Sequence, residues 1–246
     1  MDDEVIQANP ALQLGKNFLK AEDQKDNIKT LTSQDLKHLL DTVEMHYPKD
    51  YPLFLLLART GLRIGEALAL KWDDIDFNAR SIEVWRAVYK SRVTKPKNGK
   101  TRLVDMSLQL TKTLKAYELA CKKKGLALGL GDLPEYVFTN EHGRIIKSYS
   151  WREHIFNKAI KKAGMKKIRI HDLRHTYATL RISKGDNVAD ISKQLGHHSI
   201  KFTMDIYYHW FPGKKKSEVD VLDDPTYKSP THPNASYMHP GGVKTE

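Results

Sequence analysis

The residues best suited to chemistry in this chain are two arginines, two histidines and a tyrosine, spread over four segments. In chain order they are Arg63, His171, Arg174, His197 and Tyr207. An arginine guanidinium is planar and stays charged at working pH, so it binds phosphate oxygens in a bidentate manner. Histidine exchanges protons near neutrality, and a tyrosine hydroxyl becomes a nucleophile once its proton is removed. Together these side chains suit the cleavage of a phosphodiester without a metal ion.

Spacing brings some of these groups together and separates others. On a helix, His171 and Arg174 lie roughly 60° apart around the axis, so both reach one point near the helix N-terminus, where anions are favoured. The alternative is a histidine that caps its helix and an arginine paired with Asp172. Tyr207 and Tyr208 diverge by roughly 100° on a helix, so only one of them can face a phosphate.

The elements that must position these residues are mostly helices. Apolar residues at three- and four-residue spacing, with Gly61 as a C-terminal cap, predict a helical body. Alternating apolar and polar residues separated by turn residues predict three short antiparallel strands. The fold class is therefore α+β, mostly α, with one small three-stranded sheet. Helices are predicted from residue 32 onwards and over 52–59, 64–70, 107–124, 148–163, 172–184, 188–195 and 199–210, and strands over 75–77, 81–85 and 101–104.

Composition narrows the setting and the partner. The chain has 246 residues and a net charge of +11, which favours a polyanion such as nucleic acid over a membrane surface. Cys121 is the single cysteine, so neither an intramolecular disulfide nor a cysteine zinc site can form. The apolar run over 53–58 is far shorter than the ~20 residues of a membrane span. We expect a cytoplasmic, nucleoid-associated protein with no membrane partner.

Four motifs give the chain a family resemblance. They are Thr-Gly-Leu-Arg-Ile-Gly-Glu at 60–66, His-Asp-Leu-Arg-His at 171–175, Leu-Gly-His at 195–197, and Tyr207. Over about residues 29–211 the chain resembles the tyrosine recombinases, and more narrowly a phage or conjugative-transposon integrase. The resemblance implies the catalytic fold of that family and a two-step transesterification. A tyrosine attacks DNA and forms a 3′-phosphotyrosine, and the freed 5′-hydroxyl then attacks the phosphotyrosine of a partner strand.

The resemblance also implies which residues hold the phosphate. Arg63 and Arg174 would bind the non-bridging oxygens, where preorganised donors supply on the order of 3 kcal/mol each. His197 would donate to a phosphate oxygen, and Glu66 would orient Arg63. The alternative for Arg63 is an arginine at a helix end that binds only carbonyls or Glu66.

Proton transfer would fall to other residues. Tyrosine has an ordinary pKa of about 10, so Tyr207 needs a base, and His171 is the candidate, with His175 supporting the site from behind. A lysine on the hairpin of the sheet would protonate the leaving 5′-oxygen. We expect Lys97 in that role, with two rivals, Lys95 and Lys100.

The expected partner is double-stranded DNA, contacted mainly through its phosphates. We expect a homotetramer on recombination sites, a monomer or weak oligomer without DNA, an excision factor as a further partner, and no cofactor or metal. Four cations are predicted to contact DNA from beside the site: Lys90, Arg92, Lys147 and Arg152.

We expect three regions along the chain. Residues 1–28 are a linker or the remnant of an upstream DNA-clamping region, and residues 29–211 form the catalytic domain. Residues 212–246 are a proline-rich tail, partly disordered, that docks in trans on a neighbouring subunit.

Three alternatives come from other classes of protein. His171 and His175 are four apart, as in zinc proteases, but Asp172 stands where that motif requires glutamate. A DNA-binding protein without catalysis would have a broken catalytic set. A type IB topoisomerase shares the tyrosine chemistry but relaxes DNA without strand exchange.

Overall fold

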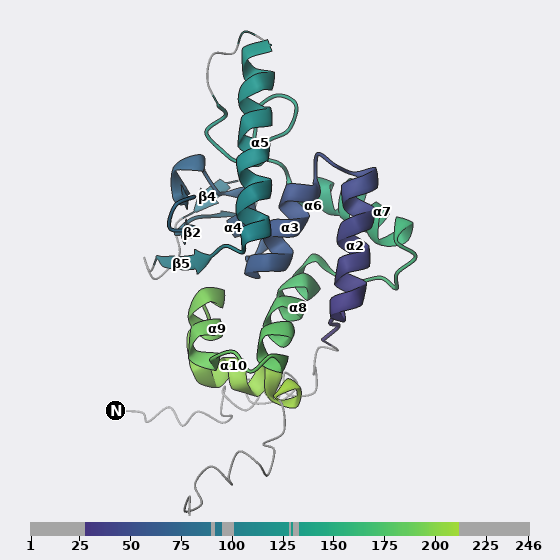
Figure 1. Ribbon diagram of the computed structural model, residues 1–246, viewed down its shortest axis with the longest axis vertical. Helices are drawn as coiled ribbons and strands as arrows, with labels where there is room; N and C mark the ends of the chain where they lie inside the picture. The colour runs from purple at the N-terminus through teal and green to yellow at the C-terminus, as the bar shows by residue number, and fades with distance from the viewer. Residues whose placement is uncertain (1–27, 90–91, 95–100, 128, 130–132, 212–246) are drawn as a thin grey trace, which may run out of the picture. The chain divides into compact units, whose positions relative to one another are not determined.

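The described part of the chain is a helical body with a small sheet on one side (Figure 1). The structure is a computed structural model, and it describes residues 28–89, 92–94, 101–127, 129 and 133–211. Its helices are α2 (Ser33–His46), α3 (Tyr51–Thr60), α4 (Ile64–Leu68), η1 (Trp72–Asp74), α5 (Leu108–Ala127), α6 (Ser148–Trp151), η2 (Arg152–Phe156), α7 (Asn157–Lys162), α8 (Ile170–Ser183), α9 (Val188–Leu195), α10 (Ile200–Tyr207) and η3 (Tyr208–Trp210). Its strands are β1 (Ile75–Asp76), β2 (Ser81–Val84), β3 (Ala87–Tyr89), β4 (Arg92–Thr94) and β5 (Arg102–Asp105).

Helix α3 lies at the centre of this body. Its residues 53–57 are all apolar and almost fully buried, because α2, α5 and α8 pack around it. Helix α2 is amphipathic and begins with a capping box, in which Thr32 and Asp35 each bind the backbone N–H of the other. Both helices confirm the elements predicted from the apolar spacing.

A glycine turn joins α3 to α4. Gly61 has a left-handed backbone (φ 64°), and a Cβ there would lie 2.6 Å from Cδ1 of Tyr177 and 2.7 Å from Cδ2 of Leu195. Only glycine allows α8 and α9 to approach this turn so closely. The turn therefore sets where Arg63, two residues later, stands relative to those helices.

The predicted three-stranded sheet is confirmed, with strand order β1-β2-β5 and antiparallel pairing. Ile82 pairs with Val104, and both face inward with Ile75, while Glu83 and Leu103 face solvent. Inward and outward residues alternate because successive side chains of a strand point to opposite faces.

A second, two-stranded sheet was not predicted. Strands β3 and β4 pair with each other, and their residues are exposed or only partly buried, so they lack the alternation that marks a half-buried strand. Strand β3 packs against α4, where a Cβ on Gly65 would meet the carbonyl oxygen of Val88 at 2.6 Å. The glycine of the Arg-Ile-Gly-Glu motif thus permits this contact.

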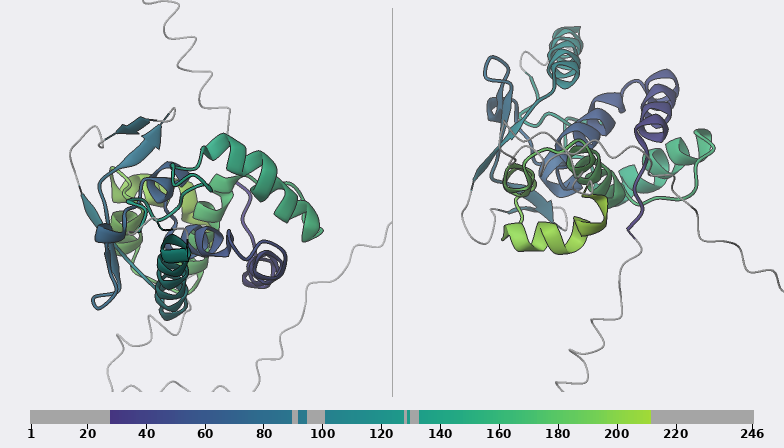
Figure 2. Two further views of the ribbon diagram at one scale, coloured as in Figure 1. Left: turned by 90° about the horizontal axis from the view of Figure 1, so that it is seen from above. Right: turned by 60° about the horizontal axis from the view of Figure 1, so that its bottom comes forward.

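The C-terminal helices form a second, smaller core. Helix α10 packs against both α8 and α9, as the right-hand view of Figure 2 shows. The small core consists of six buried residues: Tyr177, Ala178, Ile182, Ile191, Leu195 and Tyr207.

The predicted helix over 148–163 is α6, η2 and α7 in succession, with a π-helical turn in the middle.

Several predictions fall outside the described residues. They concern the linker up to residue 27, the tail from residue 212, and four lysines, Lys90, Lys95, Lys97 and Lys100. Within the ranges that the structure describes, no helix is both long and apolar enough to cross a membrane.

Candidate active site

Arg63 stands at the N-terminus of α4 and is held there by Glu66. The backbone N–H of Arg63 donates to Oε2 of Glu66 at 2.9 Å, and its Nη1 donates to Oε1 at 3.0 Å. The Arg63 side chain nevertheless remains 46% exposed. The guanidinium is thus oriented by Glu66 and still has donors that can bind a ligand.

Arg174, in contrast, is buried, with 2% of its surface exposed. Its Nη1 donates to the carbonyl oxygen of Gly61 at 2.8 Å, and its Nη2 donates to that of Leu195 at 2.7 Å. The alternative pairing of Arg174 with Asp172 is wrong, because Asp172 closes a capping box with Arg169 at the start of α8. Arg174 therefore connects the two motif segments that precede Arg63 and His197.

Burial, followed by the nearby charge of Arg63, lowers the pKa of Arg174 to about 9. The guanidinium still carries its charge near neutral pH. Two cations held this close together attract an anion strongly, since an arriving phosphate oxygen relieves their mutual repulsion.

The histidines lie beside these cations. The rings of His171 and His175 meet edge to face, with centroids 4.8 Å apart. His197 follows the left-handed Gly196, and its Nδ1 lies 2.7 Å from Oγ1 of Thr203. Desolvation and then the charges of His175 and Arg174 lower the pKa of His171 to about 4. Burial and then Arg174 lower that of His197 to about 3, so both rings are neutral near pH 7.

Tyr207 ends α10 inside the small core, and only 1% of its surface is exposed. Its hydroxyl hydrogen-bonds to Nδ1 of His175 at 2.8 Å, whereas the sequence pointed to His171 as its proton acceptor. The difference arises because residues 171 and 175 are one helical turn apart, and the buried His175 faces the end of α10. Burial raises the pKa of Tyr207 to about 12, opposed by the charge of Arg174.

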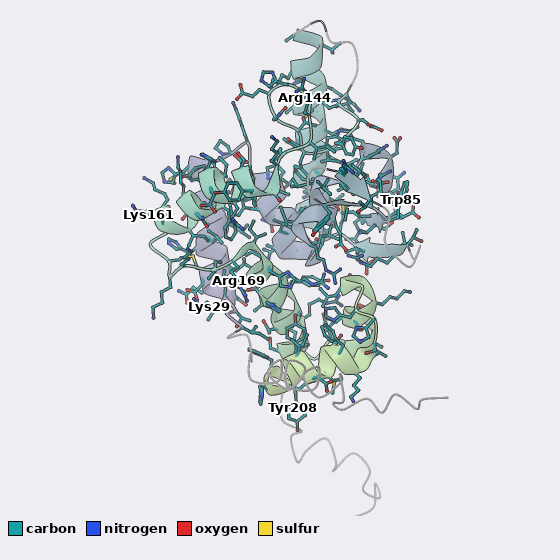
Figure 3. All side chains as sticks on the ribbon, turned by 180° about the vertical axis from the view of Figure 1, so that it is seen from behind. Lys29, Trp85, Arg144, Lys161, Arg169 and Tyr208 are labelled. Atoms are coloured by element: carbon teal, nitrogen blue, oxygen red, sulfur yellow. The ribbon has the colours of Figure 1, made fainter. Side chains whose placement is uncertain are left out.

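The neighbouring Tyr208 has a different environment. It is 66% exposed, and Figure 3 shows its side chain at the outer end of the α8–α10 region. The two tyrosines diverge as expected for adjacent helical residues, and Tyr207 is the one whose ring lies against His197, with centroids 6.4 Å apart.

The structure thus places six predicted side chains in one region, which we call the arginine–histidine cluster. Its members come from the N-terminal cap of α4, from α8, from the loop after α9, and from α10. They are Arg63, His171, Arg174, His175, His197 and Tyr207.

One important residue was missed by the sequence reasoning. Arg102 on β5 donates from Nη1 and Nη2 to Glu66, at 3.1 and 2.6 Å. Burial alone would raise the pKa of Glu66, but the hydrogen bonds and charges of Arg102 and Arg63 outweigh it and lower that pKa. The sequence did contain an indication of this role: Arg102 lies two residues before the apolar Val104, so an arginine occupies an inward-facing position of the predicted strand.

The predicted DNA contacts that the structure describes lie on the surface. Arg92 on β4 and Lys147 before α6 are exposed. Arg152 donates to Glu153 at 2.9 Å and lies over the ring of Tyr149, so part of its binding capacity is used within the chain. Lys90 and Lys97 lie outside the described residues.

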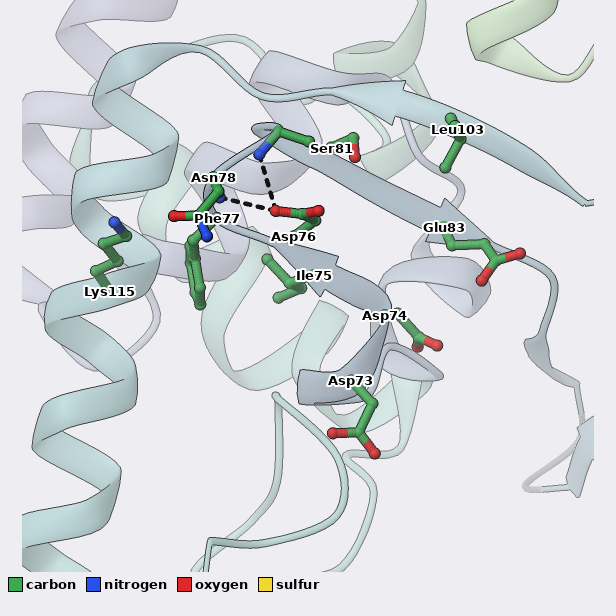
Figure 4. A pocket seen from close by; sticks show the side chains of 11 residues that line it. Asp73, Asp74, Ile75, Asp76, Phe77, Asn78, Ser81, Glu83, Leu103 and Lys115 are labelled. Carbon is green, nitrogen blue, oxygen red and sulfur yellow. Dashed lines mark hydrogen bonds between the residues drawn. The ribbon is translucent and has the colours of Figure 1, made fainter.

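A surface cavity of about 880 Å³ lies elsewhere, on the outer side of the sheet (Figure 4). Its lining includes the carboxylates of Asp73, Asp76 and Glu83, and no predicted site residue. This acidic surface is unsuited to a polyanion. In the part of the chain that the structure describes, no group of three or more histidine, cysteine, aspartate or glutamate side chains is arranged to hold a metal ion.

The arrangement and the fold define a class of protein. Two guanidinium groups, neutral imidazoles and a phenol can bind a phosphodiester and displace one of its oxygens. Among solved structures, the fold is similar to the Tn1549 transposon integrase in complex with a circular intermediate DNA. The TM-score is 0.66 with 19% identity, covering 82% of this chain and 67% of that one. XerA recombinase is also similar, with a TM-score of 0.58 and 27% identity over 88% of this chain and 76% of that one. The fold is that of the tyrosine recombinase catalytic domain.

Comparison of sequences gives the family. The model of the Phage integrase family matches residues 29–213. A "Tyrosine recombinase XerC-like" protein of Caldanaerobacter subterraneus subsp. tengcongensis is 33% identical, over 80% of this chain and 54% of that protein. The ICEBs1 integrase of Bacillus subtilis is 30% identical, over 90% of this chain and 60% of that protein. The chain belongs to the Phage integrase family, whose members are tyrosine-type site-specific recombinases, and it spans 54–60% of the length of these two relatives.

Proposed function

We propose that this chain provides the catalytic domain, residues 29–211, of a site-specific DNA recombinase that integrates or excises a mobile element. The observation that carries the proposal is the arginine–histidine cluster, in which distant segments contribute two cations, neutral imidazoles and a buried phenol. The similarity to the ICEBs1 integrase and to transposase A of transposon Tn554 from Staphylococcus aureus, 30% identical over 83% of this chain, supports a mobile element.

In the proposed reaction, Arg63 and Arg174 bind the non-bridging oxygens of one DNA phosphate, and His197 donates a further hydrogen bond. The Tyr207 oxygen attacks phosphorus in line, so the new P–O bond forms as the bond to the 5′-oxygen breaks. The phenol proton passes to an imidazole, His171 or His175, and the leaving 5′-oxygen takes a proton from Lys97. The product is a 3′-phosphotyrosine, which the 5′-hydroxyl of a partner strand attacks in the reverse sense. No metal ion takes part.

The burial of Tyr207 imposes one requirement on this reaction. Because Tyr207 is 1% exposed and hydrogen-bonded to His175, its hydroxyl must become accessible before it can meet a phosphate. The His175 ring is already in contact with that hydroxyl, and it therefore joins His171 as a proton acceptor in our proposal.

Binding is proposed to rest on phosphate contacts, in keeping with the net charge of +11. Lys90, Arg92, Lys147 and Arg152 are the proposed contacts beside the site. We propose a homotetramer on paired recombination sites, a monomer or weak oligomer without DNA, and an excision factor for removal of the element. The tail from residue 212 would dock on a neighbouring subunit.

The test is covalent trapping on a nicked suicide substrate, from which the short cleaved strand diffuses away. In the presence of EDTA, we expect the unmodified chain and Tyr208→Phe to form a protein–DNA complex and Tyr207→Phe to form none. Tyr208 is the matched control because it is adjacent and exposed. Peptide mapping of the complex should place the linkage on residue 207. A linkage to another residue, or a requirement for a divalent cation, would refute the proposal.

A further inference from the structure

Arg102 lies at the meeting point of the sheet and the arginine–histidine cluster. It occupies an inward-facing position of β5, and its side chain is only 14% exposed. All three kinds of guanidinium nitrogen are used: Nη1 and Nη2 donate to the carboxylate of Glu66, and Nε donates to the carbonyl oxygen of Gln194 at 2.8 Å. One side chain therefore binds both α4 and the C-terminal end of α9.

Through Glu66, Arg102 acts on Arg63. The Oε1 atom of Glu66 accepts from both arginines, at 3.0 Å from Arg63 and 3.1 Å from Arg102. The Oε2 atom accepts from the backbone of Arg63 at 2.9 Å and from Arg102 at 2.6 Å. Without the fork of Arg102, half of these bonds are lost and the buried carboxylate can turn, so the direction of Arg63 is no longer set.

At its other end, Arg102 supports the segment that carries His197. The carbonyl oxygen of Leu195, next to Gln194, accepts a hydrogen bond from Arg174. Gly196 follows in a left-handed conformation, and a Cβ there would lie 3.0 Å from the guanidinium of Arg102. Because His197 comes next, the loop that presents it is fixed on one side by Arg102 and on the other by Arg174.

We propose that Arg102 is a positioning residue, which aligns Arg63 through Glu66 and His197 through the Gln194–Gly196 segment. Arg102 does not contact DNA itself. Its loss slows cleavage far more than it weakens DNA binding, because a misplacement of about 1 Å at a reacting group reduces rates on the order of 100-fold. This inference rests on the proposed recombinase function.

The experiment uses the full chain and two versions of the nicked substrate. One has an ordinary phosphodiester at the cleavage position, and the other has a methylphosphonate there, which replaces a charged oxygen with a methyl group. The transition state on the methylphosphonate carries less negative charge, so it depends less on correctly aimed arginines. The rate of covalent complex formation in a single turnover and the Kd for DNA are measured for each protein.

The variants are Arg102→Ala and Arg102→Lys, with Arg144→Ala as the matched control for loss of one arginine. Arg144 is exposed, and Figure 3 shows it well away from α8. Arg102→Lys keeps a cation beside Glu66 and tests the inference if the alanine variant fails to fold, which a thermal melt reports. Lysine lacks the planar fork and cannot make the same three contacts.

On the phosphodiester, we expect a loss on the order of 100-fold in rate for Arg102→Ala and about 10-fold for Arg102→Lys, with Kd within about threefold of the unmodified chain. On the methylphosphonate, both losses should shrink to a few-fold. Equal losses on the two substrates, or unchanged rates on the phosphodiester while Arg144→Ala is also unchanged, would overturn the inference and leave the proposed function intact. If the unmodified chain forms no phosphotyrosine complex at all, it is the proposed function that fails.

Discussion

At the scale of single residues, the two arginines of the cluster differ in their surroundings. Arg174 is buried and bound to two backbone carbonyls, so it contributes to the tertiary structure as well as to the charge of the site. Arg63 is half exposed, and Glu66 binds only part of its donor capacity. In the proposed reaction both arginines bind the phosphate, Arg63 from the surface of the protein and Arg174 from its buried position.

The lowered pKa values of His171 and His197 predict a stability that depends on pH. Both groups are harder to protonate in the folded chain than in the unfolded one, where the ordinary value is about 6.5. The unfolded state therefore binds more protons at mildly acidic pH, and stability falls as the pH drops from about 6.5 toward the folded values of about 4 and 3. We expect a lower urea midpoint at about pH 5 than at about pH 7.5.

The double variant His171→Gln and His197→Gln should flatten this pH dependence, because glutamine does not titrate. His142→Gln is the control, since His142 lies exposed in a turn away from the cluster. If the double variant loses as much stability between the two pH values as the unmodified chain does, the histidines are not the source of the effect.

At the scale of elements, glycine turns decide how closely the helices approach. Gly61 and Gly164 have nearly the same left-handed backbone, with φ of 64° and 66°. A Cβ at residue 61 would meet Tyr177 and Leu195, whereas a Cβ at residue 164 would have no atom within 4 Å. This pair separates the backbone cost of an alanine from the cost of displacing α8 and α9.

We predict that Gly164→Ala lowers the free energy of unfolding by about 1–2 kcal/mol, the cost of a left-handed alanine. Gly61→Ala should cost a further 1–3 kcal/mol or so, because overpacking forces the small core apart. It should also reduce cleavage, since Arg174 binds the carbonyl of residue 61. Urea unfolding of both variants measures the difference, and equal losses would show that the contact between this turn and the helices does not matter.

At the scale of the whole molecule, charge is distributed unevenly over the described surface. The outer side of the sheet has the acidic cavity with Asp73, Asp76 and Glu83, although the chain as a whole is strongly basic. A DNA duplex should therefore avoid this surface and lie along the one that presents Arg63. Lys115 also lines the acidic cavity, and we therefore expect that it does not contact the DNA.

This distribution predicts a specific salt dependence. The logarithm of the DNA-binding constant falls linearly with the logarithm of the salt concentration, and each phosphate contact makes this fall steeper by about 0.9. Arg92→Ala and Lys147→Ala should each reduce the slope by about 1, and Lys115→Ala should leave it unchanged. Affinities measured by fluorescence anisotropy between about 50 and 200 mM salt test this. An equal change for all three variants would mean that net charge, and not position, governs binding.

Much of the fold could be read from local patterns. The leucine spacing of α2, the apolar run of α3 and the alternation in β2 and β5 each follow from burial of one face, and the structure confirms them. The pairing of β3 with β4 could not be predicted, because their exposed or partly buried residues have no alternation and the position of β3 against α4 depends on a glycine. The π-helical turn within the 148–163 helix could not be predicted either, because no local sequence pattern marks it.

The chain's sequence alone was enough to name the chemically capable side chains and the family, since a motif such as His-Asp-Leu-Arg-His can be recognised within a single short segment. Which of these groups touch depends on how the chain packs: Tyr207 contacts His175 instead of His171, Arg174 binds Gly61 and Leu195, and Arg102 supports Glu66. The physical reason is that residue type and periodicity are local properties. Hydrogen bonds between positions 21 to 113 residues apart depend on how whole helices and strands pack.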